Sequence, residues 1–270
     1  MAGDYLHRDE TPFGQAVWER IDEAVVGAAK AQMSARRLLH VEGPYGLGLK
    51  SLPAADPLPQ ERTPEGEAGI LAAGAVPVAV IRSPFRLAAR DIAACEQTGL
   101  PLDLTPAAKA AVACARQEDD LIFNGSKALG CAGLLNAKGA LCCELASWDE
   151  IGAAAGDLIR AVTVMDDAGF HGPYTLALAP ALFNLLLRRY PQGGTEKEHV
   201  ETILGDGVVK APAIGAGGVL MASGKYYASI VLGQDLATAF VGPDGADYGF
   251  MVRESAVLRL VVPEAVCVLR

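Results

Sequence analysis

Three short patterns in the sequence carry residue types that could do chemistry. Cys142 or Cys143 with His171 would supply a thiolate nucleophile and an imidazole base. The carboxylates of the run Glu118–Asp120 could hold a hard cation. The glycine-rich segment Gly215–Gly218 could cradle a phosphate if it opened a helix. Each pattern also has a structural interpretation, and the surrounding sequence favours that interpretation in all three cases.

The structural interpretations follow from what surrounds each pattern. Nothing places the two cysteines beside the histidine, and adjacent buried cysteines are usually inert. The acidic run has no partner histidine, and we interpret it as a solvated helix end. The glycine-rich segment leads into a predicted strand, which makes it a turn. The sequence also has no Gly-x-Ser-x-Gly, Walker or His-Glu-x-x-His motif, so we predict that the chain is not an enzyme.

Metal and cofactor sites are not expected either. The six cysteines show no Cys-x-x-Cys spacing, and the four histidines are scattered without ligand spacing. Reduced cysteines of this kind are typical of a cytosolic protein. The first ten residues carry acids where a signal peptide needs a basic end and an apolar run. We therefore predict a cytoplasmic protein with no bound metal and no cofactor.

The composition indicates a large buried interface. Hydrophobic residues make up 51% of the chain, and the mean hydropathy is +0.25, which is high for a soluble monomer. No run of about 18 uncharged apolar residues is present to cross a membrane. The apolar excess is therefore expected to meet other protein, with an unusually apolar core as the alternative. The net charge of −9 argues against binding nucleic acid through its phosphates.

The first long helix is predicted to run from Thr11, as its cap, and Pro12, at its first position, to about Ala35. Its apolar residues recur at three- and four-residue steps and form two adjacent stripes, so the helix is expected to bury more than one face. An ordinary core helix explains this pattern, and so does a helix whose second stripe binds something else. The second stripe comprises Trp18, Val25, Ala29 and Met33.

A stretch rich in proline and glycine covers residues 47–75. It has few large apolar side chains and cannot offset its ordering entropy by burial alone. It is either a mobile surface loop or a long hairpin that pairs with a neighbouring subunit. Two arms of about 14 residues, at roughly 3.3 Å per residue, would each reach about 45 Å, which exceeds what a compact domain needs internally.

The remaining pattern predicts short helices and strands without regular alternation. Helices are expected from Thr105 to about Glu118, from a capping box at Ser147 to about Ala168, from Pro180 to Arg189, and from a second capping box at Thr195 to Gly205. Strands are expected over residues 76–81, 174–179, 219–222, 226–232 and 250–262. This order favours an α+β fold with largely antiparallel sheets over a doubly wound one.

Five short segments carry a family resemblance. They are residues 36–46 (Arg-Arg-Leu-Leu-His-Val-Glu-Gly-Pro-Tyr-Gly), 118–125, 172–176, 232–236 and 262–265. Taken in order, they resemble the signature of family 1 encapsulins, also known as linocin-type bacteriocins, from about His7 to the end. The resemblance implies the Hong Kong 97 phage major-capsid fold with a peripheral domain, an axial domain and an extended loop. It also implies self-assembly into a hollow icosahedral shell around cargo enzymes.

The same resemblance implies a division of the chain. Residues 1–46 would form the N-terminal helix and the start of the peripheral domain, residues 47–82 the extended loop, and residues 83–130 the peripheral domain with its spine helix. Residues 131–222 would form the axial domain, and residues 223–270 would return to the peripheral domain.

A groove facing the shell interior is implied as the site for the targeting peptides of cargo proteins. Its expected lining is Ile21 and Val25 on the first helix, Arg36 and His40 in the following turn, and Ile230 and Leu232 on a late strand. Many relatives carry an acid where this chain has His40. Because histidine ordinarily titrates at about pH 6.5, docking could depend on pH in this chain. Some relatives bind a flavin on an aromatic residue, but Arg90 stands at that position and no flavin is expected.

The resemblance implies a five-fold pore at the loop that follows the helix predicted from Pro180 to Arg189. The loop is Tyr190, Pro191, Gln192, Gly193 and Gly194, with Arg189 beside it. If Arg188 and Arg189 faced the channel, they would form a positive ring that favours anions. Alternatively, both would only stabilise the end of their own helix, where cations complement the helix dipole.

The implied partners are further copies of the chain, in a multiple of sixty, and a cargo protein that carries a targeting peptide. A ferritin-like protein or a dye-decolorising peroxidase is common in the family, which would make iron storage or oxidative-stress defence the task of the compartment. Neither nucleic acid nor a membrane is expected as a partner. The alternatives are a phage-type major capsid protein that packages nucleic acid and a stand-alone hydrolytic enzyme or bacteriocin.

Overall fold

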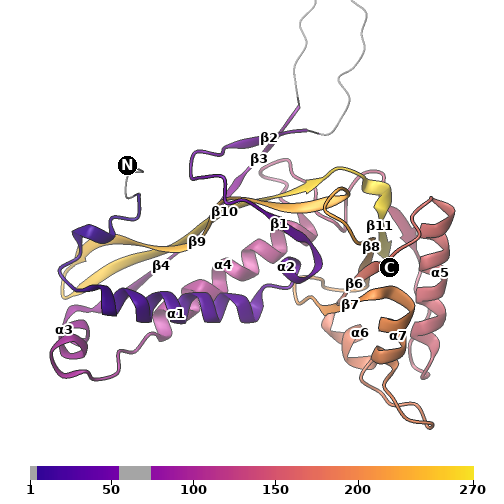
Figure 1. Ribbon diagram of the computed structural model, residues 1–270, viewed down its shortest axis with the longest axis horizontal. Helices are drawn as coiled ribbons and strands as arrows, with labels where there is room; N and C mark the ends of the chain where they lie inside the picture. The colour runs from indigo at the N-terminus through magenta and orange to yellow at the C-terminus, as the bar shows by residue number, and fades with distance from the viewer. Residues whose placement is uncertain (1–4, 55–73) are drawn as a thin grey trace, which may run out of the picture.

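The computed structural model describes residues 5–54 and 74–270. It consists of an elongated lobe and a compact lobe (Figure 1). The elongated lobe packs two long helices, α1 (Gln15–Gln32) and α4 (Thr105–Asn124), against a four-stranded sheet. The compact lobe surrounds a five-stranded sheet with α5 (Ala153–Asp167), α6 (Pro180–Leu185) and α7 (Glu196–Leu204).

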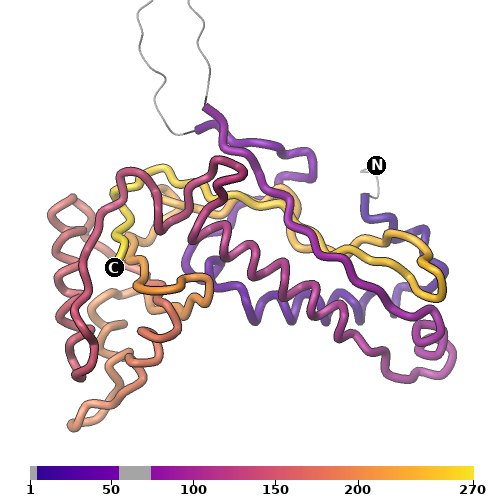
Figure 2. Tube along the Cα trace, turned by 180° about the vertical axis from the view of Figure 1, so that it is seen from behind, coloured from indigo at the N-terminus to yellow at the C-terminus, as the bar shows by residue number. Residues whose placement is uncertain are grey.

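The four-stranded sheet runs in the order β1-β9-β10-β4. Its central hairpin, β9 (Ala228–Asp244) and β10 (Asp247–Leu260), is antiparallel, and β4 (Ala79–Ala88) continues that pattern at one edge. The short β1 (His40–Glu42) forms the other edge and pairs in parallel with β9. The helices α1 and α4 run along this sheet (Figure 2), and α3 (Ala89–Thr98) follows β4.

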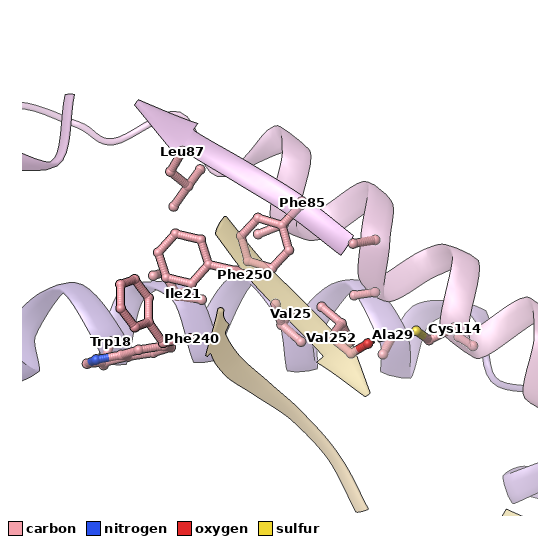
Figure 3. Packing of buried hydrophobic residues seen from close by; sticks show 14 of the residues in the cluster. Trp18, Ile21, Val25, Ala29, Phe85, Leu87, Cys114, Phe240, Phe250 and Val252 are labelled. Carbon is pink, nitrogen blue, oxygen red and sulfur yellow. Dashed lines mark hydrogen bonds between the residues drawn. The ribbon is translucent and has the colours of Figure 1, made fainter. Parts of the chain in front are cut away.

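Aromatic side chains hold the first helix against this sheet. Phe85 of β4 stacks on Phe250 of β10 with ring centroids 5.0 Å apart, and Trp18 of α1 meets Phe250 edge-on at 5.7 Å (Figure 3). Ile21 and Val25 of α1 complete the layer and are fully buried. Burial of each such side chain contributes roughly 1.5–3 kcal/mol. This packing explains why α1 carries more than one apolar stripe.

The five-stranded sheet of the compact lobe runs in the order β5-β11-β8-β6-β7. Its strands are β5 (Leu141–Cys143), β11 (Val266–Leu269), β8 (Gly218–Ala222), β6 (Tyr174–Leu178) and β7 (Gly205–Lys210). Thus β11 is an inner strand although it comes last in the sequence. Gly217 allows this close approach, because a Cβ there would lie 2.0 Å from the carbonyl oxygen of Leu269, and its φ is +71°.

Several short elements complete the fold of the described residues. They are α2 (Ala35–Leu38), the antiparallel pair β2 (Ser51–Pro53) and β3 (Ala75–Pro77), and two 3₁₀ turns, Arg8–Glu10 and Pro263–Ala265. The extended loop predicted over residues 47–82 includes residues 55–73, which lie outside the described residues. Across the two described ranges, no helix combines the length and the apolar character needed to cross a membrane.

The predicted α+β class is confirmed, with strands that differ in extent from their predictions. The pairs β1–β9, β5–β11 and β6–β7 are parallel, and the other described pairs are antiparallel. The strand predicted over 226–232 continues to Asp244, because it forms one long hairpin with β10. The strand predicted over 76–81 is instead divided at Val78, whose N–H bonds to the carbonyl of Lys50 between β3 and β4.

The start of α1 lies later than predicted. Thr11 does not cap the helix, because its hydroxyl donates to the carbonyl of Arg8 and accepts from the indole N–H of Trp18. The helix begins after Gly14, so Pro12 lies in the preceding turn.

The capping box predicted at Thr195 is confirmed. The Thr195 hydroxyl accepts from the backbone N–H of Glu198, and the Glu198 carboxylate accepts from the backbone N–H of Thr195. The helix α7 ends at Gly205 as predicted, with a φ of +87°.

The capping box predicted at Ser147 is wrong. The Ser147 hydroxyl bonds to Asp149 in the loop, and α5 begins only at Ala153. The reason is tertiary: the buried carboxylate of Asp157 accepts from the Trp148 indole N–H at 2.9 Å and holds this segment against the side of the helix.

The predicted solvated helix end at the acidic run is also wrong. The helix α4 continues through that run to Asn124, and Glu118 and Asp119 are buried within it. In the opposite sense, α6 is shorter than predicted and ends at Leu185 rather than at Arg189.

Candidate functional site

The chain turns sharply between α1 and β1, and α4 fixes this turn, which we call the elbow (residues 33–42). The Asp119 carboxylate accepts from the backbone N–H groups of Ser34 at 2.8 Å and Ala35 at 2.9 Å, and from the Ser34 hydroxyl at 2.6 Å. It therefore ends α1 at Gln32, before the predicted Ala35, and starts α2. Burial raises the pKa of Asp119, and these hydrogen bonds oppose the rise.

Arg36 joins the elbow to three other elements. Its guanidinium lies 2.6 Å from Glu118 Oε2 on α4, 2.9 Å from Glu254 Oε2 on β10 and 2.8 Å from Asp235 Oδ1 on β9. The Glu118 and Glu254 side chains are fully buried, and the Arg36 side chain is only 18% exposed. The guanidinium expected to face a cargo peptide is thus engaged by internal carboxylates, and its role in the subunit is structural.

The four apolar residues expected to line the cargo groove lie in the core. Ile21 and Val25 belong to the cluster between α1, α4 and the sheet, whereas Ile230 and Leu232 belong to a second cluster that joins the two lobes. None of the four exposes more than 2% of its surface. These side chains are expected to meet at one open groove. The packing does not fit that expectation, because in the subunit the four side chains lie buried in two separate core clusters.

His40 is exposed on the edge strand β1 and lies between two adjoining hollows. The first, of about 410 Å³, follows β1 toward Tyr45, Tyr226 and Arg259. The second, of about 320 Å³, extends from His40 toward Met221. Both hollows share His40 and Lys225, and we call the two together the His40 groove.

The His40 groove combines aromatic surface with charges of both signs. Tyr45 and Tyr226 are 64% and 75% exposed, and the Lys225 ammonium lies 5.5 Å from the centroid of the Tyr226 ring. Arg259 forms an ion pair with Glu42 at 2.5 Å. Because β1 is the edge of its sheet, an extended peptide could lie along it and use both aromatic rings and backbone groups.

The chain turns a corner around Pro44, and this corner forms one wall of the groove. The backbone N–H groups of Tyr45 and Gly46 donate to the carbonyls of Leu232 at 3.0 Å and Gly233 at 2.6 Å, which fixes the corner to β9. Gly43 has a φ of +104°, and a Cβ there would lie 2.5 Å from the Leu232 carbonyl oxygen. A residue with a side chain would therefore displace the corner.

The loop predicted to form the pore is the tip of the compact lobe (Figure 1). A bridge between Arg189 and Thr195 closes the loop, and the Tyr190 N–H donates to the Gly194 carbonyl at 3.1 Å. Inside this closure, Pro191, Gln192, Gly193 and Gly194 are exposed. The Tyr190 hydroxyl lies 3.2 Å from His199 Nδ1 on α7, beside a hollow of about 440 Å³.

The two arginines beside this loop have different surroundings. Arg188 donates to the Leu185 carbonyl at 2.9 Å and to the Asp149 carbonyl at 3.0 Å, and it forms an ion pair with the buried Glu196 at 3.1 Å. The contact with the carbonyl of Leu185, the last residue of α6, fits the helix-end role predicted for Arg188. Arg189 is exposed, so it is the arginine that stays available for a pore.

The residues that could do chemistry do not converge in the structure. His171 pairs with Asp166 at 3.2 Å. Burial raises the pKa of the Cys143 thiol, whereas a nucleophile needs a lowered pKa, and Cys142 is exposed. The segment Gly215–Gly218 bends at residues 216–217 and leads directly into β8, whose first residue is Gly218, so it opens a strand as predicted. Within residues 5–54 and 74–270, no three His, Cys, Asp or Glu side chains are grouped to hold a metal ion.

Known proteins share this architecture. Residues 3–257 match the family model Linocin_M18, described as encapsulating protein for peroxidase. The chain is 32% identical to the type 1 encapsulin shell protein EncA of Myxococcus xanthus, over 98% of this chain and 96% of that protein. The virus-like particle of Pyrococcus furiosus aligns with a TM-score of 0.74 and 23% identity over 94% and 99% of the two chains. The capsid of Myoviridae phage XM1 aligns with a TM-score of 0.55 and 13% identity over 86% and 88%.

The structural matches define the fold as that of the Hong Kong 97 class of capsid and shell proteins. The sequence matches are more specific, because they extend over nearly the whole chain. The chain belongs to the encapsulin shell-protein family. Its relatives are named as shell proteins, so it is a structural subunit of a capsid-like assembly rather than an enzyme.

Proposed function

We propose that this chain assembles, in a multiple of sixty copies, into a hollow icosahedral nanocompartment in the cytoplasm and encloses a cargo protein through that protein's targeting peptide. The family match over residues 3–257 carries this proposal. The family description names a peroxidase as the encapsulated protein, which favours an oxidative-stress cargo. An iron-storage cargo is the other cargo that we propose. A dye-decolorising peroxidase or a ferritin-like protein would fit these tasks.

The two lobes suggest how the subunit is divided. We assign the elongated lobe, whose described part comprises residues 5–46, 79–130 and most of 223–270, to the peripheral domain, and residues 131–222 to the axial domain. The separate sheets of the two lobes support this division. We assign the strand β11 to the axial domain, although it lies within residues 223–270, because it pairs with β5 and β8 of the compact lobe. The extended loop, expected over residues 47–82, would end at Val78, because residues 79–82 belong to β4 of the elongated lobe.

The His40 groove is the proposed docking surface for the targeting peptide. Apolar side chains of an extended peptide would pack on Tyr45 and Tyr226, which are the large exposed aromatic residues of the groove. Glu42 could receive a basic peptide residue in exchange for Arg259. His40 lies at the centre, so its protonation would repel a basic peptide and weaken docking in acid.

The loop 190–194 is the proposed lining of a five-fold pore. Its place at the tip of the compact lobe and the exposure of Arg189 support this assignment. Five copies of Arg189 around a symmetry axis would give a positive ring, which favours the entry of small anions.

Assembly and cargo are tested together by purifying the chain from its native cells. Electron microscopy should show closed particles, and mass spectrometry should find one co-eluting protein inside them. Particles that hold nucleic acid and no second protein would support the phage-type alternative. A 28.0 kDa monomer with turnover of its own would support the enzyme alternative.

Docking is tested with a fluorescent protein fused to the C-terminal segment of the co-eluting protein. Tyr226→Ala should reduce the fluorescence retained per shell, whereas Tyr5→Ala, which changes another exposed tyrosine, should not. His40→Ala should remove the difference in loading between about pH 5.5 and pH 8, and His171→Ala serves as the matched histidine control. Equal loading by wild type and Tyr226→Ala would exclude this groove.

A further inference from the structure

Two buried acids face each other in a place that the proposed function does not use. Glu118 on α4 and Glu254 on β10 have side chains with no exposed surface, and both contact the guanidinium of Arg36. The same guanidinium also pairs with Asp235 at 2.8 Å. One cation therefore serves three carboxyl groups, and the cluster holds more potential negative charge than Arg36 can balance.

The two acids are not equally satisfied. Glu118 accepts from Arg36 through both oxygens, at 2.8 Å from Nε and 2.6 Å from Nη2. Glu254 accepts from Arg36 through Oε2 alone, and its Oε1 is buried without a hydrogen-bond partner among the described residues. An ionised carboxylate with an unpaired oxygen is strongly disfavoured in a protein core. A protonated carboxyl needs only an acceptor, and the carboxyl group that shares Nη2 of Arg36 with Glu254 is that of Glu118.

We propose that Glu118 and Glu254 form a proton-binding site, in which one proton shared by the two carboxyl groups at neutral pH keeps the elbow closed and its loss at alkaline pH loosens the elbow. The proton balances the charge that Arg36 leaves unpaired. Once it is lost, three carboxylates surround one guanidinium, and their repulsion acts between α2, α4 and the sheet. Asp119, the next residue of α4, holds the backbone of the elbow, so a displacement of α4 would also disturb those hydrogen bonds.

The surroundings of Glu254 fit a retained proton. Its titratable neighbours come from three elements and are Glu118 and Cys114 on α4, Arg36 on α2 and Asp235 on β9. The remaining neighbour, β4, places apolar Ile81 opposite it. Burial and the Glu118 carboxylate raise the pKa of Glu254 to about 9, which Arg36 lowers only in part.

The direction of the pH effect follows from this raised pKa. Between the ordinary carboxyl value of 4.5 and about 9, the closed elbow binds a proton that an opened, solvated elbow releases. Each pH unit in this window therefore multiplies the opened population by up to about tenfold. The closed elbow is most stable at the acidic end of the window, and the effect levels off once the pH passes the raised pKa.

Hydrogen exchange of the assembled shell tests the proposal. Glu254→Gln keeps a donor toward Glu118 but has no proton to lose, and comparison at equal pH cancels the intrinsic pH dependence of exchange. The exchange rate of residues 33–42 in wild type, divided by that in Glu254→Gln, should rise at least about tenfold from pH 6 to pH 9. Asp120→Asn, which removes an exposed acid from the same helix, should follow wild type. A ratio that stays constant over this range overturns the proposal.

Infrared spectroscopy gives a second test that needs no variant. Wild-type shells with isotope-labelled glutamate carboxyl groups should show a protonated glutamate band at pH 7 that falls to about half near pH 9. The labelling separates this band from Asp119, whose pKa is also raised. Absence of the band at pH 7 overturns the proposal. Neither result bears on the cargo or on the pore, so the proposed function stands or falls separately.

Discussion

Two arginines hold the two regions to which function is assigned, and their partners differ in kind. Arg36 at the elbow contacts three carboxyl groups, of which two are fully buried. Arg188, beside the loop 190–194 that we propose lines a pore, contacts one buried carboxylate, Glu196, whose other oxygen accepts from the Gly152 N–H at 2.9 Å. The elbow therefore contains more carboxyl groups than its one arginine can balance. Arg188 and Glu196 instead form a one-to-one ion pair, with a further backbone donor to Glu196. We expect the elbow to respond to pH and the Arg188–Glu196 pair to respond only to geometry.

Replacing Arg36 should have the largest effect. Arg36→Met leaves Glu118 and Glu254 buried without a cation and should lower the free energy of unfolding by about 3–5 kcal/mol. Chemical denaturation of the purified shell measures this, and a failure to recover soluble shells would agree with it. Arg36→Lys keeps the charge but loses the forked geometry, so its loss of unfolding free energy should be smaller than that of Arg36→Met but not zero. A loss below about 1 kcal/mol in Arg36→Met would mean that both acids already carry protons or reach water.

Replacing Arg188 should cost less and should not depend on pH. Arg188→Met removes one partner of Glu196, which keeps its backbone donor, and frees the carbonyl of Asp149. We expect a loss of about 1–3 kcal/mol, measured by thermal unfolding at pH 6 and pH 9. The neighbouring substitution Arg189→Met is the control and should be nearly neutral. A loss that grows between the two pH values would contradict the contrast between the two arginines.

The capping box beside the pore loop should have a smaller, local effect. Thr195→Ala removes the hydroxyl that accepts from the Glu198 N–H and should cost about 1 kcal/mol. Thr195→Ser should restore most of this. Hydrogen exchange of the first turn of α7 provides the measurement, and unchanged protection there would show that packing alone holds the helix start.

Changing the exposed arginine should leave stability almost untouched. Arg189→Glu should shift the free energy of unfolding by less than about 0.5 kcal/mol, yet it should slow the entry of small anions into assembled shells relative to small cations. Stopped-flow measurement with an encapsulated anion-sensitive dye can follow this. The same anion rate in wild type and variant would remove Arg189 from the proposed pore.

The sequence predicts the features that depend on neighbouring residues where no distant contact overrides them, as Asp157 does at Ser147. The capping box at Thr195 and the stop at Gly205 involve residues within one helical turn of each end, and both are confirmed. The elbow depends instead on a hydrogen bond between Ser34 and Asp119, which lie 85 positions apart. No local pattern around Asp119 indicates that it caps another helix. The sequence alone therefore favours a solvated helix end at the acidic run.

The candidate site shows the same limit. The apolar stripe through Ile21 and Val25 indicates that a face is buried, but it does not say what covers it, and the structure covers it with the sheet and α4. Only the family resemblance singles out His40 as a candidate docking residue. Lys225 and Tyr226 reach it only through the pairing of β1 with β9, and residues so far apart in the chain give no joint signal in a single sequence.

The inner position of β11 has a consequence for synthesis on the ribosome. Its partners β5 and β8 are translated earlier and must wait with unpaired edges until residues 266–269 emerge. A polypeptide interrupted before that point would lack an inner strand of the compact lobe, and β5 would have no strand to pair with in the described sheet. The last strand to be translated therefore completes the sheet as a single unit.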